Sequence, residues 1–270
     1  MPYATDYHVH TFRCGHAGGA SRDYVRAAIA RGLDEIAFTD HVPLYFLEGD
    51  DPLPEFAMAK DELDGYVAEV LALREEFRED IDVLLGLECD YVEGREMELR
   101  SLLSPYPWDV LLGSVHWVAG DWIDAPGSAR RHEVEGSRAI FSEYYRLLSL
   151  AASSGMFDVL THFDLPKKFG HRRPPECAGD EAAAVEAARE SGIAVELSSA
   201  GLRKPIGEPY PAPPLLRALV LAEVPLVLSS DAHAPQEVAW GRAAILEAAA
   251  TAGAAEHVSF SRRERVRHPL

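Results

Sequence analysis

The chain has 270 residues, with 26 basic and 44 acidic side chains, and its formal net charge is −18. Hydrophobic residues make up 47% of the chain and charged residues 26%, which is typical of a folded globular protein and excludes extensive disorder. The acidic balance argues against non-specific binding to nucleic acid or to an anionic membrane, because such binding needs a basic surface.

Seven short apolar runs recur along the chain, and each is followed by polar residues. The runs are rich in Val, Leu and Ile without strict alternation, which is typical of parallel strands buried on both faces. The predicted strand regions are 3–11, 35–41, 82–90, 109–117, 157–164, 193–201 and 225–233.

Helix-like stretches separate these runs. Ser21 is placed as the N-cap of the first helix, and Gly32, Gly155 and Gly192 lie where helices are expected to end. The predicted helices cover residues 21–31, 61–77, 138–154, 180–190, 213–223 and 238–251. Strand followed by helix, about seven times, predicts a parallel α/β architecture.

The chain is predicted to form a single domain over residues 1–270, because no linker or low-complexity segment divides it. The last residues, 261–270, read as a short basic tail that is frayed or solvated. In six of the seven runs, candidate metal ligands lie at or just after the carboxyl end of the strand, where barrel enzymes build their active sites. Because nearly every strand contributes, a closed barrel is favoured over an open sheet.

No targeting or membrane segment is expected. The first ten residues lack a basic start followed by an apolar core, and no apolar run approaches the roughly 18 residues of a membrane span. The three cysteines Cys14, Cys89 and Cys177 are too few for a disulfide framework and too far apart for a zinc knuckle. We therefore expect a cytoplasmic protein.

Nine residues in or next to the strand runs have side chains that bind metals. They are His8, His10, His16, His41, Glu88, His116, His162, Asp231 and His233. A single histidine at a strand end is more often a hydrogen-bonded structural residue, but so many titratable groups at one face are costly without a cation. Imidazole and carboxylate together suit zinc, manganese or iron. Nine ligands are too many for one ion, so we expect two or three divalent ions.

Four further histidines, His132, His171, His257 and His268, lie in polar loops or the tail and are expected on the solvated surface. Four aspartates near the ligands are expected to orient them by hydrogen bonds. These aspartates are Asp6, Asp40, Asp90 and Asp164.

Seven segments of the chain resemble, in order and spacing, the motifs of the PHP (polymerase and histidinol phosphatase) family. The segments are HVH, CGHA, TDH, GLE, SVH, THFD and SSDAH, and the resemblance extends from residue 6 to about residue 235. HTFRCGHAGG, the KKFG after THFD and SSAGLRKPIGEPYP are similar to the histidinol-phosphatase branch in particular. The resemblance implies a distorted (β/α)7 barrel with a trinuclear metal centre.

The resemblance also implies how the ligands are shared among the ions. His8, His10, Glu88 and Asp231 would hold the first ion. Glu88 would bridge to a second ion, held by His116 and His162. The third ion would be held by His16, His41 and His233.

Such a centre would hydrolyse a phosphate ester. A water that bridges the ions loses its proton near neutral pH and would attack phosphorus in line with the leaving alkoxide. Asp231 or His233 would relay the proton that the alkoxide needs.

The phosphate needs donors of its own. Arg203, Lys168, Lys167 and Lys204 follow two of the strands and are expected to bind it. Glu208, Tyr210, Phe12, Phe46 and Trp117 would either line the rest of the substrate site or belong to the core.

The favoured function is hydrolysis of L-histidinol phosphate in histidine biosynthesis, with a small-molecule substrate and neither nucleic acid nor membrane as a partner. One alternative is a phosphatase for another small ester, or a phosphodiesterase or nuclease of the PHP type. The other is a non-catalytic metal-binding module, although such a module is expected to lose ligands, and here all nine positions are filled.

Overall fold

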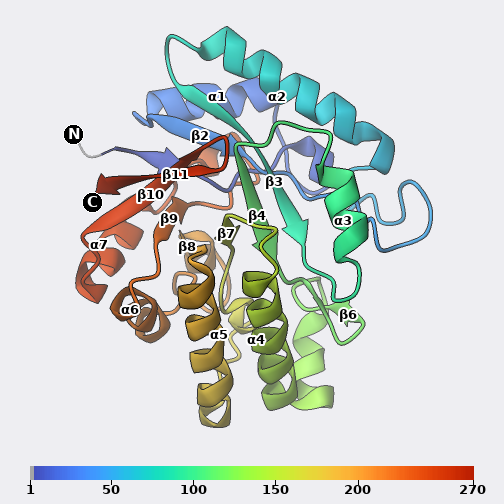
Figure 1. Ribbon diagram of the computed structural model, residues 1–270, viewed down its shortest axis with the longest axis vertical. Helices are drawn as coiled ribbons and strands as arrows, with labels where there is room; N and C mark the ends of the chain where they lie inside the picture. Colours follow the sequence, from blue (N-terminus) through green and yellow to red (C-terminus); the bar gives the residue numbers. More distant parts are fainter. Residues whose placement is uncertain (1–2) are drawn as a thin grey trace.

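Seven parallel strands form a nearly closed barrel in the computed structural model, which describes residues 3–270 (Figure 1). Met1 and Pro2 of the predicted domain lie outside the described residues. The strands, in their order around the sheet, are β1 (Thr5–Asp6), β2 (Glu35–Phe38), β3 (Asp82–Asp90), β4 (Val110–Ser114), β7 (Val159–Leu160), β8 (Ala194–Ser198) and β9 (Leu226–Ser229). All seven predicted strands are therefore confirmed, and so is the parallel barrel.

The barrel closes between its first and last strands through the segment after β1. The Tyr7 amide donates to the Leu228 carbonyl, the His10 amide donates to the Ala232 carbonyl, and Val9 forms an isolated parallel bridge with Ala232. Closure thus takes place at the carboxyl ends of the strands.

Helices surround the barrel (Figure 1). They are α1 (Ser21–Ala30), α2 (Leu63–Phe77), α3 (Glu96–Leu103), α4 (Ser137–Ser153), α5 (Ala178–Ser191), α6 (Pro213–Leu221) and α7 (Arg242–Ala252). Six of them match predicted helices, and α3 was not predicted. The prediction that Ser21 is an N-cap is wrong: Ala20 is the N-cap, and the Ser21 hydroxyl donates to Glu69 instead.

No helix in the described part of the chain has both the length and the apolar character needed to cross a membrane.

Apolar residues pack in two layers, one between the strands and the helices and one inside the barrel. The inner layer consists of Tyr7, Ala37, Leu84, Val110, Leu112, Val159, Ala194 and Val227 from the seven strand regions, together with Val258 and Phe260. Val258 and Phe260 belong to a strand that was not predicted, β10 (Glu256–Ser261).

The C-terminal residues form a hairpin rather than a frayed tail. Strand β10 pairs antiparallel with β11 (Glu264–Pro269) over six residue pairs. The Phe260 amide donates to the Tyr7 hydroxyl, and the Arg263 guanidinium pairs with Asp158 at 2.9 Å. The hairpin therefore plugs the barrel at the end opposite the ligands, while β11 itself stays largely exposed to solvent.

A second unpredicted hairpin joins β5 (Trp117–Val118) and β6 (Asp121–Trp122) directly after β4. Trp122 packs against Phe46, Phe56 and Trp117 in a small apolar cluster. This cluster covers one side of the face at which the strands end.

Candidate metal centre

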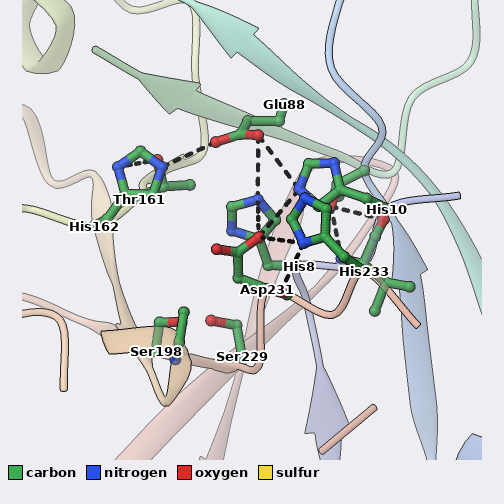
Figure 2. Close-up of polar contacts among 12 residues, drawn as sticks. His8, His10, Glu88, Thr161, His162, Ser198, Ser229, Asp231 and His233 are labelled. Atoms are coloured by element: carbon green, nitrogen blue, oxygen red, sulfur yellow. Dashed lines mark hydrogen bonds and ion pairs between the residues drawn. The ribbon is translucent and has the colours of Figure 1, made fainter. Parts of the chain in front are cut away.

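The nine predicted ligands lie together at the carboxyl ends of the strands. His8 and His10 follow β1, His41 follows β2, and Glu88 lies within β3. The remaining ligands lie in the loops after four other segments: His16 after the short helix η1 (Phe12–Cys14), His116 after β4, His162 after β7, and Asp231 and His233 after β9. Glu88 lies between His162 on one side and the histidines His8, His10 and His233 on the other (Figure 2).

One group of donors surrounds Oε2 of Glu88. This oxygen is 3.3 Å from Nε2 of His8 and 3.4 Å from Nε2 of His10. Oδ1 of Asp231 lies 3.7 Å and 3.3 Å from the same two nitrogens. Four side chains thus converge on one point, and all but Asp231 are fully buried.

The other carboxylate oxygen of Glu88 faces a second group. Oε1 is 3.0 Å from Nε2 of His162 and 3.6 Å from Nε2 of His116, and these two nitrogens are 3.2 Å apart. Glu88 therefore joins the two groups through its two oxygens.

A third group contains His16, His41 and His233. Nε2 of His16 and Nε2 of His233 are 3.0 Å apart. Gly15, directly before His16, has a φ of 80°, and a Cβ there would lie 1.8 Å from the Pro54 carbonyl oxygen, so only glycine fits where the turn before His16 packs against Pro54.

The backbone is unusual where two ligands leave their strands. His162 and Asp231 have φ values of 22° and 52°. Residues other than glycine adopt such conformations at a cost of about 1–3 kcal/mol, and they cluster at functional sites. Here the left-handed turn aims each side chain across the mouth of the barrel.

The three groups have the composition and spacing of sites for divalent cations. Two donors on one tetrahedral zinc ion, each at about 2.0–2.1 Å, lie roughly 3.3 Å apart, which is close to the separations observed here. Nε2 of His8 and both ring nitrogens of His10 are buried without a hydrogen-bond partner. Buried polar atoms are rarely left without a partner. A cation bound here would coordinate these nitrogens, for which the protein supplies no hydrogen-bond partner.

Charges in the cluster are mutually dependent. Burial would raise the pKa of Glu88, but the histidines around it, His41 and His8 first, hold this pKa well below its usual value. Burial lowers the pKa of His10 well below its usual value, and the nearby His233 and His41 add to the effect. The imidazole of His10 is therefore neutral, the form that binds a metal.

Several side chains outside the predicted set hold the ligands in place. Oε1 of Glu196 lies 2.6 Å from Nδ1 of His8, and its Oε2 accepts a hydrogen bond from the His162 amide. The Ser114 hydroxyl donates to Oε1 of Glu88 at 2.6 Å. Sequence reasoning missed Glu196, although a charged residue inside the apolar run IAVEL was a usable signal.

The four aspartates expected to orient ligands differ in what they contact. Asp90 lies 2.8 Å from Nδ1 of His116. Asp40 accepts two hydrogen bonds from Thr11, and Asp6 accepts from Ser230 and Ala239 on either side of the Asp231 loop. Asp164 pairs with Lys167 and the Ala212 amide, so of the four aspartates only Asp90 has a hydrogen bond to the side chain of a predicted metal ligand within the described part of the chain.

A cavity of about 340 Å³ opens over the ligands. Arg203, Lys168 and Lys204 line it, together with Tyr210, which the sequence left open as substrate-lining or core, and Glu237, which was not predicted. Arg203 donates through Nη2 to the carbonyls of Ser230 and Asp231, while its buried Nη1 has no partner. Lys168 is held by the carboxylate and carbonyl of Asp124.

Lys167 does not reach this cavity. Its amine is buried, donates to the Pro209 carbonyl and pairs with Asp164 at 2.9 Å. A phosphate role for Lys167 therefore finds no support in its position, because its amine is already held by Asp164 and the Pro209 carbonyl.

A second cavity of about 480 Å³ adjoins the first and shares His16, His41, His116, Asp124 and Lys168 with it. Phe56, Trp122, Ala125 and Pro126 give it a mainly apolar wall. Of the aromatic residues left open above, Tyr210 lines the first cavity, whereas Phe46 and Trp117 pack behind Trp122.

Two of the four histidines expected on the surface are buried, which corrects that expectation. His132 stacks on His171 with ring centroids 4.0 Å apart, and His257 lies in β10 with its Nε2 on the Tyr3 carbonyl. Neighbouring polar sequence misled the prediction, because the residues that contact these rings, His171 for His132 and Tyr3 for His257, lie far away in the chain.

A nearly closed parallel barrel that gathers imidazole and carboxylate donors at its carboxyl face is the arrangement of a metal-dependent barrel enzyme. The model of the PHP domain matches residues 6–200. The chain belongs to the PHP family.

Its relatives share most of their length with it. A protein of Deinococcus radiodurans named "Probable histidinol-phosphatase" is 41% identical over 233 residues, covering 86% of this chain and 87% of the relative. The histidinol-phosphatase of Bacillus subtilis is 31% identical over 263 residues, covering 90% and 98%. The solved histidinol phosphate phosphatase of Lactococcus lactis, in complex with zinc, L-histidinol and phosphate, has the same fold. Its TM-score is 0.79 at 22% identity, with 97% of this chain and 98% of that chain covered.

Proposed function

We propose that this protein is a metal-dependent phosphomonoesterase that hydrolyses L-histidinol phosphate to L-histidinol and inorganic phosphate. The observation that carries the proposal is the Glu88 carboxylate, held between groups of histidine nitrogens on the floor of a cavity whose wall carries cationic side chains. The relative that is 41% identical over most of both chains supports the choice of substrate. The reaction would serve histidine biosynthesis in the cytoplasm.

The proposed centre holds up to three divalent ions. One would be held by His8, His10, Glu88 and Asp231 and a second by Glu88, His116 and His162. The third would be held by His16, His41 and His233. Zinc is the first candidate, because the structurally similar protein of Lactococcus lactis contains it, and iron and manganese suit the same donors.

When bound, the ions would supply positive charge and lower the pKa of coordinated water. The residues of the chain would do the rest. Arg203, Lys168 and Lys204 line the cavity, and their cationic groups would bind the phosphate oxygens. Asp231 and His233 lie beside the cavity, and one of them would pass a proton to the alkoxide as the phosphorus–oxygen bond breaks.

The adjoining cavity would receive the organic part of the substrate. Histidinol carries an imidazole ring and an ammonium group. Phe56 and Trp122 offer apolar ring faces, and Asp124 offers a carboxylate whose pKa stays far below its usual value: burial would raise it, but Lys168 outweighs burial. A polynucleotide would meet a surface of high negative charge and cavities of a few hundred Å³, so a small ester fits better.

The test is a substrate panel with the purified protein loaded with zinc, manganese or iron. Phosphate release is measured from histidinol phosphate, from other small phosphate monoesters and from a phosphodiester, and cleavage of single-stranded DNA is followed in parallel. We expect the highest kcat/KM for histidinol phosphate. The metal-loaded Glu88→Gln variant should release no phosphate. If histidinol phosphate is not hydrolysed but single-stranded DNA is cleaved, the protein is a nuclease and the proposal is wrong. Substoichiometric metal and no hydrolysis would favour a binding module.

A further inference from the structure

Cys14 lies at the edge of the proposed centre, where no function is assigned to it. It ends η1, is fully buried and is a free thiol. Its Sγ, a ring nitrogen of His10 and a ring nitrogen of His233 all lie within 4.8 Å of one another. The backbone carbonyl of Cys14 also accepts from Nδ1 of His16 at 2.8 Å, so this residue already shapes the site.

The histidine beside Cys14 differs from the other ligands. Among the ligand histidines of the described chain, His10 has both ring nitrogens buried and without a hydrogen-bond partner. His8 contacts Glu196, His116 contacts Asp90, and His233 contacts the Asp231 carbonyl through Nδ1. Nε2 of His10 lies near the carboxylates of Glu88 and Asp231, whereas the other ring nitrogen has no partner.

We propose that the Cys14 sulfur is a metal ligand that acts with His10 and His233. The inference rests on the proposed metal centre and adds a sulfur donor to it. As the sulfur–metal bond forms, the thiol proton leaves to water, and His10, which would then bind one ion through each ring nitrogen, loses its ring proton to water as well. Because His233 also belongs to the group with His16 and His41, the sulfur lies beside that ion position. A thiolate favours zinc over manganese, so this position would discriminate between these ions.

Cobalt substitution tests the ligand directly and needs no activity measurement. The ions of the purified protein are exchanged for Co²⁺, and the near-ultraviolet absorption of a sulfur-to-cobalt charge transfer is recorded. We expect the band in the wild-type protein and in Cys177→Ser, and its loss in Cys14→Ser. Cys177 is a matched control, because it is also buried and free but contacts Ser142 and the Arg138 carbonyl.

Metal competition provides a second readout. Replacing Cys14 with serine should lower the affinity for zinc relative to manganese at one position by at least about tenfold, measured by equilibrium dialysis and elemental analysis. Cobalt bound by the wild-type protein without the charge-transfer band, or with a band that survives in Cys14→Ser, would overturn the role of Cys14 alone. A wild-type spectrum without the band overturns the role even if the variant does not fold. Failure to bind cobalt at all would instead overturn the proposed centre.

Discussion

Glu88 joins two groups of ligands because each of its oxygens is held differently. Oε1 accepts from Ser114 and faces His162, whereas Oε2 lies near His8, His10 and His41. Glu88 lies in a strand fixed on both sides by parallel neighbours, so its carboxylate cannot turn away without loss of these contacts. The position of Glu88 at the centre of the site thus depends on a rigid strand and on the contacts of its two carboxylate oxygens.

Glu196 should matter for metal affinity although it is not itself a proposed ligand. Replacing it with glutamine keeps its size but weakens its hold on Nδ1 of His8. Such changes typically lower metal affinity or activity by about 10- to 100-fold. We expect a loss of this size in zinc titrations of Glu196→Gln. Exposed Glu247→Gln is the control, and equal affinity in both variants would contradict the role.

Arg203 should act mainly in substrate binding. Arg203→Ala removes the guanidinium from the cavity wall, at an expected cost of roughly 1.5–3 kcal/mol for a hydrogen bond to a charged group. Steady-state kinetics with histidinol phosphate should show a raised KM with a smaller change in kcat. A fall in kcat alone would place Arg203 in the chemical step instead.

The C-terminal hairpin is the element that completes the barrel. Val258 and Phe260 of β10 fill its interior beside residues from all seven strand regions, and Tyr7 bonds to Phe260 through its hydroxyl. Strand β11 holds β10 in place but faces water. In this hairpin the buried strand β10 contributes side chains to the core, whereas the exposed strand β11 contributes only backbone pairing.

Truncation of the two strands should have unequal effects. Phe260→Ala leaves a cavity in the barrel and should lower the free energy of unfolding by about 3–5 kcal/mol. Val266→Ala on half-exposed β11 should change it by less than about 0.5–1 kcal/mol. Urea denaturation followed by circular dichroism compares the two. Similar losses would mean that β10 is not part of the core.

The hairpin should also make stability depend on pH. Burial, with the nearby His268 second, lowers the pKa of His257 to about 4, against about 6.5 for an exposed histidine. Between these values the unfolded chain binds more protons than the folded one, so stability rises with pH through this window and is lost as pH falls. The contribution is on the order of 3 kcal/mol.

His257→Gln can still donate to the Tyr3 carbonyl but cannot be protonated. In metal-free protein, the free energy of unfolding of this variant should fall less between pH 6.5 and 4.5 than that of the wild type. The other histidines are common to both proteins and cancel in the difference. Parallel pH profiles would exclude His257 as a source of the dependence.

At the scale of the whole molecule, the proposed centre connects strands that are distant in the chain. Its ligands come from β1, β2, β3, β4, β7 and β9, so they meet only in the folded barrel. Ligand binding to the native state alone stabilises it by about 2.7 kcal/mol when the free ligand is at 100 times Kd. Metal should therefore hold together the face at which the barrel closes.

Removal of metal should lower the thermal stability. We expect a chelator to reduce the Tm measured by scanning calorimetry by several degrees, and zinc added back in excess should restore it. Magnesium added back is the control, because it prefers oxygen donors and water. An unchanged Tm would mean that the site is already rigid without an ion.

Sequence alone determined the seven barrel strands, six of the helices and the nine candidate ligands, because these depend on local patterns. Buried parallel strands read as apolar runs, and HVH and DAH are short motifs that stand at strand ends. What depends on distant contacts needed the tertiary structure: Glu196 holding His8, Lys167 turning away from the cavity, Cys14 beside His10, and the tail folding into the barrel. The reason is physical, since the fate of a polar side chain is decided by its partners in space, and these lie tens to hundreds of residues away along the chain.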